Sequence, residues 1–228
     1  MDLSWEYISM IWPSMQKGLW ETLRLFVLTL VFSLPLGLPL ALGSIARFWI
    51  VRLPFRIYVW LFRGTPLMLQ LFFFYYGLGI IAQKYGLLFL RLDRVTAAVI
   101  TFSLNYAAYF AEIYRAGIQS IDRGQYEAAK TLGFSRTRTM FAIIIPQTIR
   151  RIIPPICNET ITLIKDTALV YVIALTELIK TAREAVNSDT TNTAFAMAAV
   201  MYLSATFILT VIYQRLEKRF SRHEREAL

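Results

Sequence analysis

The sequence predicts an all-α integral membrane protein with five transmembrane helices and one short cytoplasmic hairpin. Of its 228 residues, 57% are hydrophobic and only 17% are charged. Several uncharged runs reach the roughly 20 residues that a helix needs to cross the hydrocarbon core of a bilayer. Basic residues concentrate in alternate connecting segments, which is typical of membrane proteins with a fixed orientation. Residues 1–228 are therefore expected to form one transmembrane domain.

The first three spans follow from the uncharged runs. The first covers residues 25–46, where two prolines predict a kink that neighbouring helices tolerate. The second covers about residues 64–83, although it could begin as early as Pro54 and be broken at residues 64–66. The third covers about residues 95–111.

The remaining spans and the charge distribution fix the expected orientation. The fourth span follows residue 150, and the fifth covers residues 190–214 and ends in a basic tail, residues 215–228. If the N-terminus is outside, the inner segments hold sixteen basic residues and the outer ones six. We therefore expect the N-terminus outside and the tail inside. The N-terminus has no basic leader, so the first span should be retained.

The segment over residues 122–147 predicts two short helices in the loop between the third and fourth spans. Asp122 can cap a helix over residues 123–132, and Gln125 can reach back to complete a capping box. Gly133 stands where a helix often ends with a positive φ. Ser135 can then cap a second helix, which Pro146 should interrupt. By itself, this pattern also fits an amphipathic hairpin that only lies on the membrane surface.

Three groups of residues in this loop carry a resemblance to a known family. They are Glu127, Ala128 and Ala129, then Gly133, then Ile145, Pro146 and Gln147. The spacing resembles the cytoplasmic loop of membrane-spanning subunits of bacterial ABC importers, although that family usually has Leu where Ile145 stands. Residues 62–78, 107–121 and 165–178 are similar to the subfamily that imports polar amino acids.

The resemblance implies a permease subunit in the bacterial inner membrane, with a core of five helices. It implies that Glu127, Ala128, Ala129, Gly133 and Pro146 dock on a separate ATP-hydrolysing subunit, which holds ATP and Mg. It also implies a second copy or a related permease chain, and an extracytoplasmic amino-acid-binding protein. The chain has no phosphate-binding Gly-x-x-x-x-Gly-Lys motif, so ATP hydrolysis is expected on another polypeptide and no cofactor on this one.

Three charged residues within the fourth span are candidates for the substrate site. Counting from Arg151, Glu159 lies about 12 Å and Asp166 about 22 Å along a helix, inside a core of about 30 Å. Charges there must pair or line a cavity. Either Lys165 forms a buried ion pair with an acid, or the carboxylates receive the amino group or cationic side chain of a polar amino acid. Additional hydrogen bonds are expected from Asn158, Thr160 and Asn105, although Asn105 fits helix packing equally well.

The segment from Arg63 to Pro66 also has two readings. Thr65 as N-cap and Pro66 at the first helical position would simply start a helix, with Arg63 reaching the membrane surface. Alternatively, a helix broken at Gly64 and Thr65 would direct free N–H groups at a substrate carboxylate. The sequence leaves both open.

Other classes of function are less well supported. A secondary transporter would need internal repeats, and a membrane scaffold leaves the buried charges unexplained. The single Cys157 and single His223 offer neither a catalytic set nor a metal site. The basic residues flank the predicted spans, so their expected partner is anionic membrane lipid rather than nucleic acid.

Overall fold

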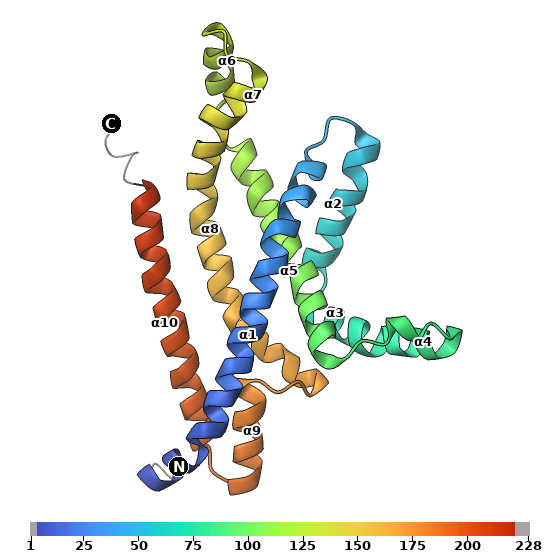
Figure 1. Ribbon diagram of the computed structural model, residues 1–228, viewed down its shortest axis with the longest axis vertical. Coiled ribbons are helices and arrows are strands. Elements are labelled where there is room, and N and C mark those ends of the chain that lie inside the picture. The colour runs from blue at the N-terminus through green and yellow to red at the C-terminus, as the bar shows by residue number, and fades with distance from the viewer. Residues whose placement is uncertain (1–3, 222–228) are drawn as a thin grey trace.

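The computed structural model describes residues 4–221, and this part of the chain contains helices and connections but no strand (Figure 1). The helices are α1 (Trp5–Ser44), α2 (Trp49–Gly64), α3 (Leu67–Phe72), α4 (Leu78–Tyr85), α5 (Arg94–Gln119), α6 (Arg123–Thr131), α7 (Arg136–Thr139), α8 (Ile145–Asp166), α9 (Leu178–Asp189) and α10 (Thr193–Ser221). Two π-helical segments, η1 (Phe73–Gly77) and η3 (Met140–Ile144), and two 3₁₀ segments, η2 (Leu88–Leu90) and η4 (Thr167–Ile173), connect them. Of the predicted basic tail, residues 222–228 with His223 lie outside the described residues.

Helix α5 forms the centre of the molecule. Asp93 starts it by accepting hydrogen bonds from the backbone N–H groups of Val95 and Thr96, 3.0 and 3.1 Å away. The Thr96 hydroxyl and N–H hold the pKa of the Asp93 carboxyl below its usual value. Phe102 and Phe110 of α5 are completely buried among residues of α1, α8 and η4. Burial of such aromatic side chains anchors the surrounding helices.

Helix α1 packs closely against α5 through its small residues. It remains helical through Pro35 and Pro39, which are exposed, while Gly37 is buried on the opposite side. A Cβ at Gly37 would lie only 2.9 Å from the Cβ of Phe110. A larger residue would therefore push the two helices apart.

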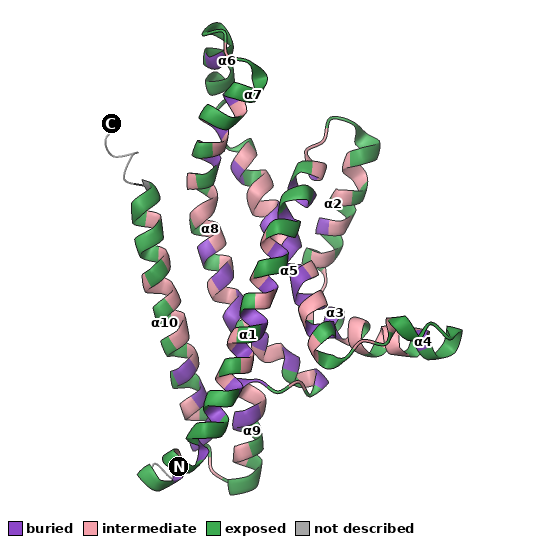
Figure 2. Ribbon diagram, viewed as in Figure 1, coloured by how far each residue is buried: buried purple, intermediate pink, exposed green. Residues whose placement is uncertain are grey.

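Four helical stretches are long and apolar enough to cross a membrane. They are Trp5–Ser44, Leu67–Tyr85, Arg136–Ile173 and Thr193–Phe220. Helix α5, which contains the expected third span, is not among them, because Thr, Ser, Asn, Tyr and Glu residues lower its mean hydropathy. Much of α5 is buried against other helices (Figure 2). A helix enclosed in this way does not need a strongly apolar surface.

The N-terminal part of α1 forms a second small core that the sequence pattern did not predict. Helix α1 begins at Trp5, well before the expected span, and its Ile11 and Met15 pack against α9 and α10. The sequence did not predict α9 either. Glu177 caps it by accepting hydrogen bonds from Ile179 N (2.7 Å) and Lys180 N (2.5 Å).

The second predicted span is broken, as its alternative reading allowed. Helix α2 ends at Gly64 and α3 begins at Leu67, so the break falls at Thr65 and Pro66. Beyond it, α3 and α4 project sideways from the bundle, across the direction of α1, α8 and α10 (Figure 1). The N-cap of α3 is Pro66, so the prediction of Thr65 as N-cap was wrong by one residue.

Candidate functional site: a terminal hairpin and a charged face of α5

Helix α6 stands at one extreme end of the molecule, and both of its predicted end signals are confirmed (Figure 1). The Asp122 side chain accepts a hydrogen bond of 2.6 Å from Gly124 N. Gly133 has a φ of 76° and donates to Lys130 O (3.0 Å), while Phe134 N donates to Ala129 O (2.9 Å). This is a Schellman termination, which satisfies the last carbonyls of the helix and fixes the direction in which the chain leaves.

Two details of the hairpin differ from the prediction. Gln125 does not complete a capping box, because its side-chain oxygen accepts a hydrogen bond of 3.2 Å from Nε2 of Gln147. Pro146 does not interrupt the second helix, because the π-helical turn η3 precedes it and α8 continues past it. Ile145 N donates to Met140 O in that wider turn. A π-turn adds a residue to the helix and accommodates a proline that has no N–H to donate.

The end of the hairpin presents an apolar surface. Glu127 and Ala128 are exposed, whereas Ala129 is 1% exposed and is unavailable for the close approach expected of it. Leu132 and Phe141 are instead 73% and 70% exposed. The sequence analysis did not single out Leu132, although an apolar residue directly before a terminating Gly was a visible signal. Phe141 lies within the candidate membrane span Arg136–Ile173, whereas Leu132 lies outside it and is available for contact with another protein.

A polar network holds the break between α2 and α3 against α5. Nδ2 of Asn105 donates to Phe62 O (3.0 Å) and to Oε1 of Gln70 (3.1 Å). Nε2 of Gln70 lies 2.7 Å from Oγ1 of Thr65, whose hydroxyl donates to Leu61 O (2.8 Å). The predicted residues Asn105 and Thr65 are therefore engaged in packing, and Gln70 is a partner that the sequence analysis did not identify. The network supplies hydrogen bonds to buried polar groups that the break in the helix leaves without helical partners.

The two acids of α8 lie one above the other, seven residues apart. Asp166 accepts a hydrogen bond of 2.7 Å from the hydroxyl of Tyr106 on α5, and Glu159 is half-buried. Lys165 is exposed, and no ion pair in residues 4–221 joins it to either acid. Lys165 thus pairs with neither acid within one chain, and the expected ion pair that fixes a dimer stays a prediction.

The two neutral candidates on α8 lie differently. Thr160 is buried, and its hydroxyl donates to Ile156 O (2.7 Å) within the same helix. Asn158 is exposed. The structure thus does not bring either side chain into contact with Glu159 or Asp166 through a hydrogen bond.

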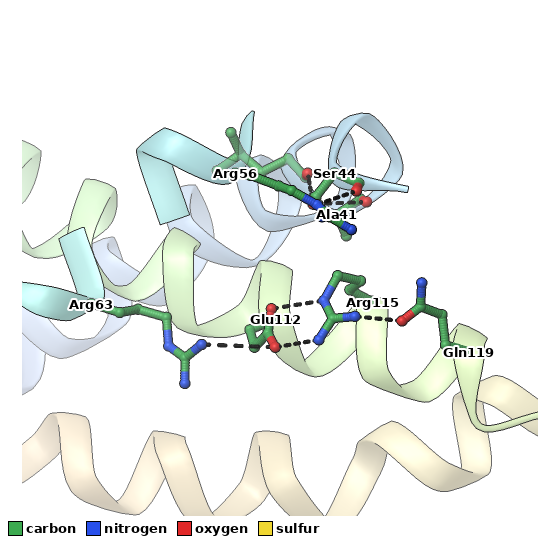
Figure 3. Close-up of polar contacts among 8 residues, drawn as sticks. Ala41, Ser44, Arg56, Arg63, Glu112, Arg115 and Gln119 are labelled. Carbon is green, nitrogen blue, oxygen red and sulfur yellow. Dashed lines mark hydrogen bonds and ion pairs between the residues drawn. The ribbon is translucent and has the colours of Figure 1, made fainter. Parts of the chain in front are cut away.

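A group of charges continues along α5 toward the hairpin (Figure 3). Arg115 Nε donates to Glu112 (2.8 Å), and a second Arg115 nitrogen contacts the other carboxylate oxygen. Arg63, at the end of α2, approaches Glu112 only to 3.9 Å and lies over the ring of Tyr109, 5.3 Å from its centroid. Arg63, Glu112 and Arg115 line a cavity of about 590 Å³. Its other lining residues are Ser44, Arg56, Val59, Trp60 and Gly64.

No cluster of His, Cys, Asp and Glu suitable for a metal occurs in the described residues. Cys157 is buried. The candidate site thus comprises a projecting hairpin with an exposed apolar residue at its tip and a charged, partly open cavity between α2 and α5.

Comparisons with known proteins agree with this arrangement. Residues 33–222 match the family model described as binding-protein-dependent transport system inner membrane component. The L-cystine transport system permease protein TcyB of Bacillus subtilis is 36% identical, over 97% of this chain and 93% of the relative. The arginine transport system permease protein ArtQ of the same species is 38% identical over 93% and 94%. The histidine/lysine/arginine/ornithine permease protein HisM of Escherichia coli K12 is 35% identical over 90% and 88%.

Solved structures share the fold. An amino acid ABC transporter crystallised with histidines superposes with a TM-score of 0.86 at 31% identity, over 96% of this chain and all of the other. An inward-facing MetNI methionine ABC transporter gives a TM-score of 0.72 at 16% identity, over 93% and 98%, which shows the fold alone.

Proposed function

The chain belongs to the family of binding-protein-dependent transport system inner membrane components and is a transmembrane permease subunit of an ABC importer, and we propose that its cargo is polar amino acids. Relatives named for cystine, for arginine and for histidine, lysine and ornithine support this class. The observation that carries it here is the pair of carboxylates, Glu159 and Asp166, on α8 with no basic partner in an ion pair among the described residues. A cationic group of the cargo would supply the missing charge.

We also propose five spans, with the N-terminus outside and the C-terminal end inside. The fifth span is α5, which the other helices enclose. The arrangement supports this topology because α6 and the C-terminal end of α10 lie at one end of the molecule and the start of α1 at the other (Figure 1). Residues at the α6 end also include most of the lysines and arginines, as expected of a cytoplasmic surface.

The hairpin is the proposed docking element for the separate ATPase subunit, which would bind ATP and Mg. Glu127 and Ala128 line its exposed face, Gly133 sets its exit, and Pro146 lies in the first turn of the helix that leads to the acids. Leu132 adds an apolar contact. Because α8 runs continuously from the hairpin to Asp166, movement of the docked tip would reach the cargo site directly. The complex would contain a second copy or a related permease and an extracytoplasmic binding protein.

The test is uptake of radiolabelled arginine, histidine and glutamate into proteoliposomes that contain the permease, its ATPase and its binding protein. We expect ATP-dependent uptake of the first two and little of the third. Glu159→Gln and Asp166→Asn, made singly, should reduce uptake without loss of assembled complex. Uptake driven by an ion gradient without ATP would indicate a secondary transporter, and no uptake of any polar amino acid would favour a scaffold.

A further inference from the structure

Arg63 is a cation with unused hydrogen-bond donors beside the proposed cargo site. Its side chain is 40% exposed and lines the cavity between α2 and α5. Within residues 4–221, no hydrogen bond takes any of its N–H groups, and its one ion-pair contact, to Glu112, is long at 3.9 Å. A guanidinium carries five donors in a planar fork that fits a carboxylate in two parallel hydrogen bonds. Arg63 therefore has the chemistry of a carboxylate receptor.

The neighbouring arginines are already engaged. Arg115 uses three nitrogens, two on Glu112 and one on Gln119 (Figure 3). Arg56 donates its Nε to the carbonyl of Ser44 at 3.3 Å. Because Arg115 holds Glu112 more closely than Arg63 does, Glu112 neutralises Arg115 first. The positive charge of this face is thus carried by Arg63 and Arg56, and of the two Arg63 has no hydrogen bond among the described residues.

A row of aromatic side chains links Arg63 to the acids of α8. Its guanidinium lies over Tyr109, the rings of Tyr109 and Tyr106 are 6.1 Å apart, and the Tyr106 hydroxyl binds Asp166. One face of the fold therefore presents two carboxylates and one guanidinium along a strip of tyrosines.

We propose that Arg63 binds the α-carboxylate of the cargo while Glu159 and Asp166 receive its amino group or cationic side chain. This assignment rests on the proposed amino-acid transport and adds the residue that binds the carboxylate of the cargo. A dipolar amino acid would lie with its anionic end toward Arg63 and the α6 end of the permease. Stacking on Tyr109 orients the guanidinium before the cargo arrives, which lowers the entropic cost of binding.

The test compares each amino acid with its decarboxylated amine on the same protein. The permease–ATPase complex, purified in nanodiscs without the binding protein, is titrated calorimetrically with arginine and agmatine, and with histidine and histamine. Arg63→Gln removes the charge, Arg63→Lys keeps it without the fork, and Arg56→Gln is the matched control on the same helix and cavity. Thermal unfolding checks that each variant is folded.

We expect the wild-type complex to bind the amino acid of at least one pair about tenfold or more tighter than its amine. Arg63→Gln should bind both members equally, Arg63→Lys should keep part of the preference, and Arg56→Gln should keep all of it. A preference that persists in Arg63→Gln, equal weakening of both ligands, or no preference in the wild type would overturn the assignment. If the wild type binds none of the four compounds, the proposed amino-acid cargo itself is wrong.

Discussion

Replacing Gly133 by Ala tests whether the exit of the hairpin from α6 controls coupling. The substitution changes only the backbone preference, because a Cβ at this position would meet nothing within 4 Å. The residue has a φ of 76°, where a side chain costs about 1–2 kcal/mol. The strain can be relieved by breaking the bonds from Gly133 N to Lys130 O and from Phe134 N to Ala129 O. A change of this size shifts a local equilibrium roughly 5- to 30-fold.

Two further variants isolate the cause. Gly133→Asn should be nearly normal because Asn tolerates the left-handed conformation better than Ala does. Gly79→Ala is the matched control, since Gly79 also has open space for a Cβ but lies in α4 without a positive φ. The assay is substrate-stimulated ATPase activity in proteoliposomes, together with hydrogen exchange of the amides of residues 123–134. We expect lower stimulation and faster exchange for Gly133→Ala only. Identical results for Gly133→Ala and Gly133→Asn would refute the backbone argument.

Three other predictions address topology, docking and packing. In a Cys157→Ser background, an impermeant thiol reagent applied to intact cells should label a cysteine at exposed Ser14 and spare one at exposed Thr137, and the reverse pattern would invert the topology. Leu132→Asp should weaken binding of the ATPase subunit in pull-down experiments without changing the permease's thermal unfolding, because Leu132 is 73% exposed, and undiminished capture would exclude it from the interface. Asn105→Ala should destabilise the permease by about 1–3 kcal/mol, since Oε1 of Gln70 loses its donor, whereas Phe62 O keeps the hydrogen bond from Nε2 of Gln70. An unchanged melting temperature would show that the network contributes little.

Local rules predicted the hairpin well because its end signals act over a few residues. The Asp122 cap and the positive φ of Gly133 each depend on the type of a single local residue, which can be read from the sequence. Gln125 was mispredicted because a competing partner, Gln147, lies 22 residues away. Pro146 was mispredicted because a π-turn, which has no clear sequence signal, absorbs the missing hydrogen bond.

Elements that depend on packing were harder to predict. Helix α9 follows Glu177, an unusual N-cap residue, although the apolar residues Leu178 and Ala182 already show helical spacing. The position of the break between α2 and α3 could be predicted from its Gly and Pro. The side chains that stabilise the break by hydrogen bonds could not be predicted. Asn105 is 35 residues from Gln70, and only the folded chain brings the two together.

The adjacent charges at the end of α8 show why sequence proximity was a poor guide to the cargo site. Consecutive residues of an α-helix point about 100° apart, so Lys165 and Asp166 face different surroundings. Asp166 reaches Tyr106 on α5, whereas Lys165 is exposed. The acid therefore keeps a neutral hydrogen-bond donor as its direct partner. Arg63 is likewise only weakly held, because Glu112 lies 3.9 Å away. The guanidinium of Arg63 and the carboxylate of Asp166 thus both remain available to a ligand. In the proposed site, a dipolar molecule would pair with both charges at once.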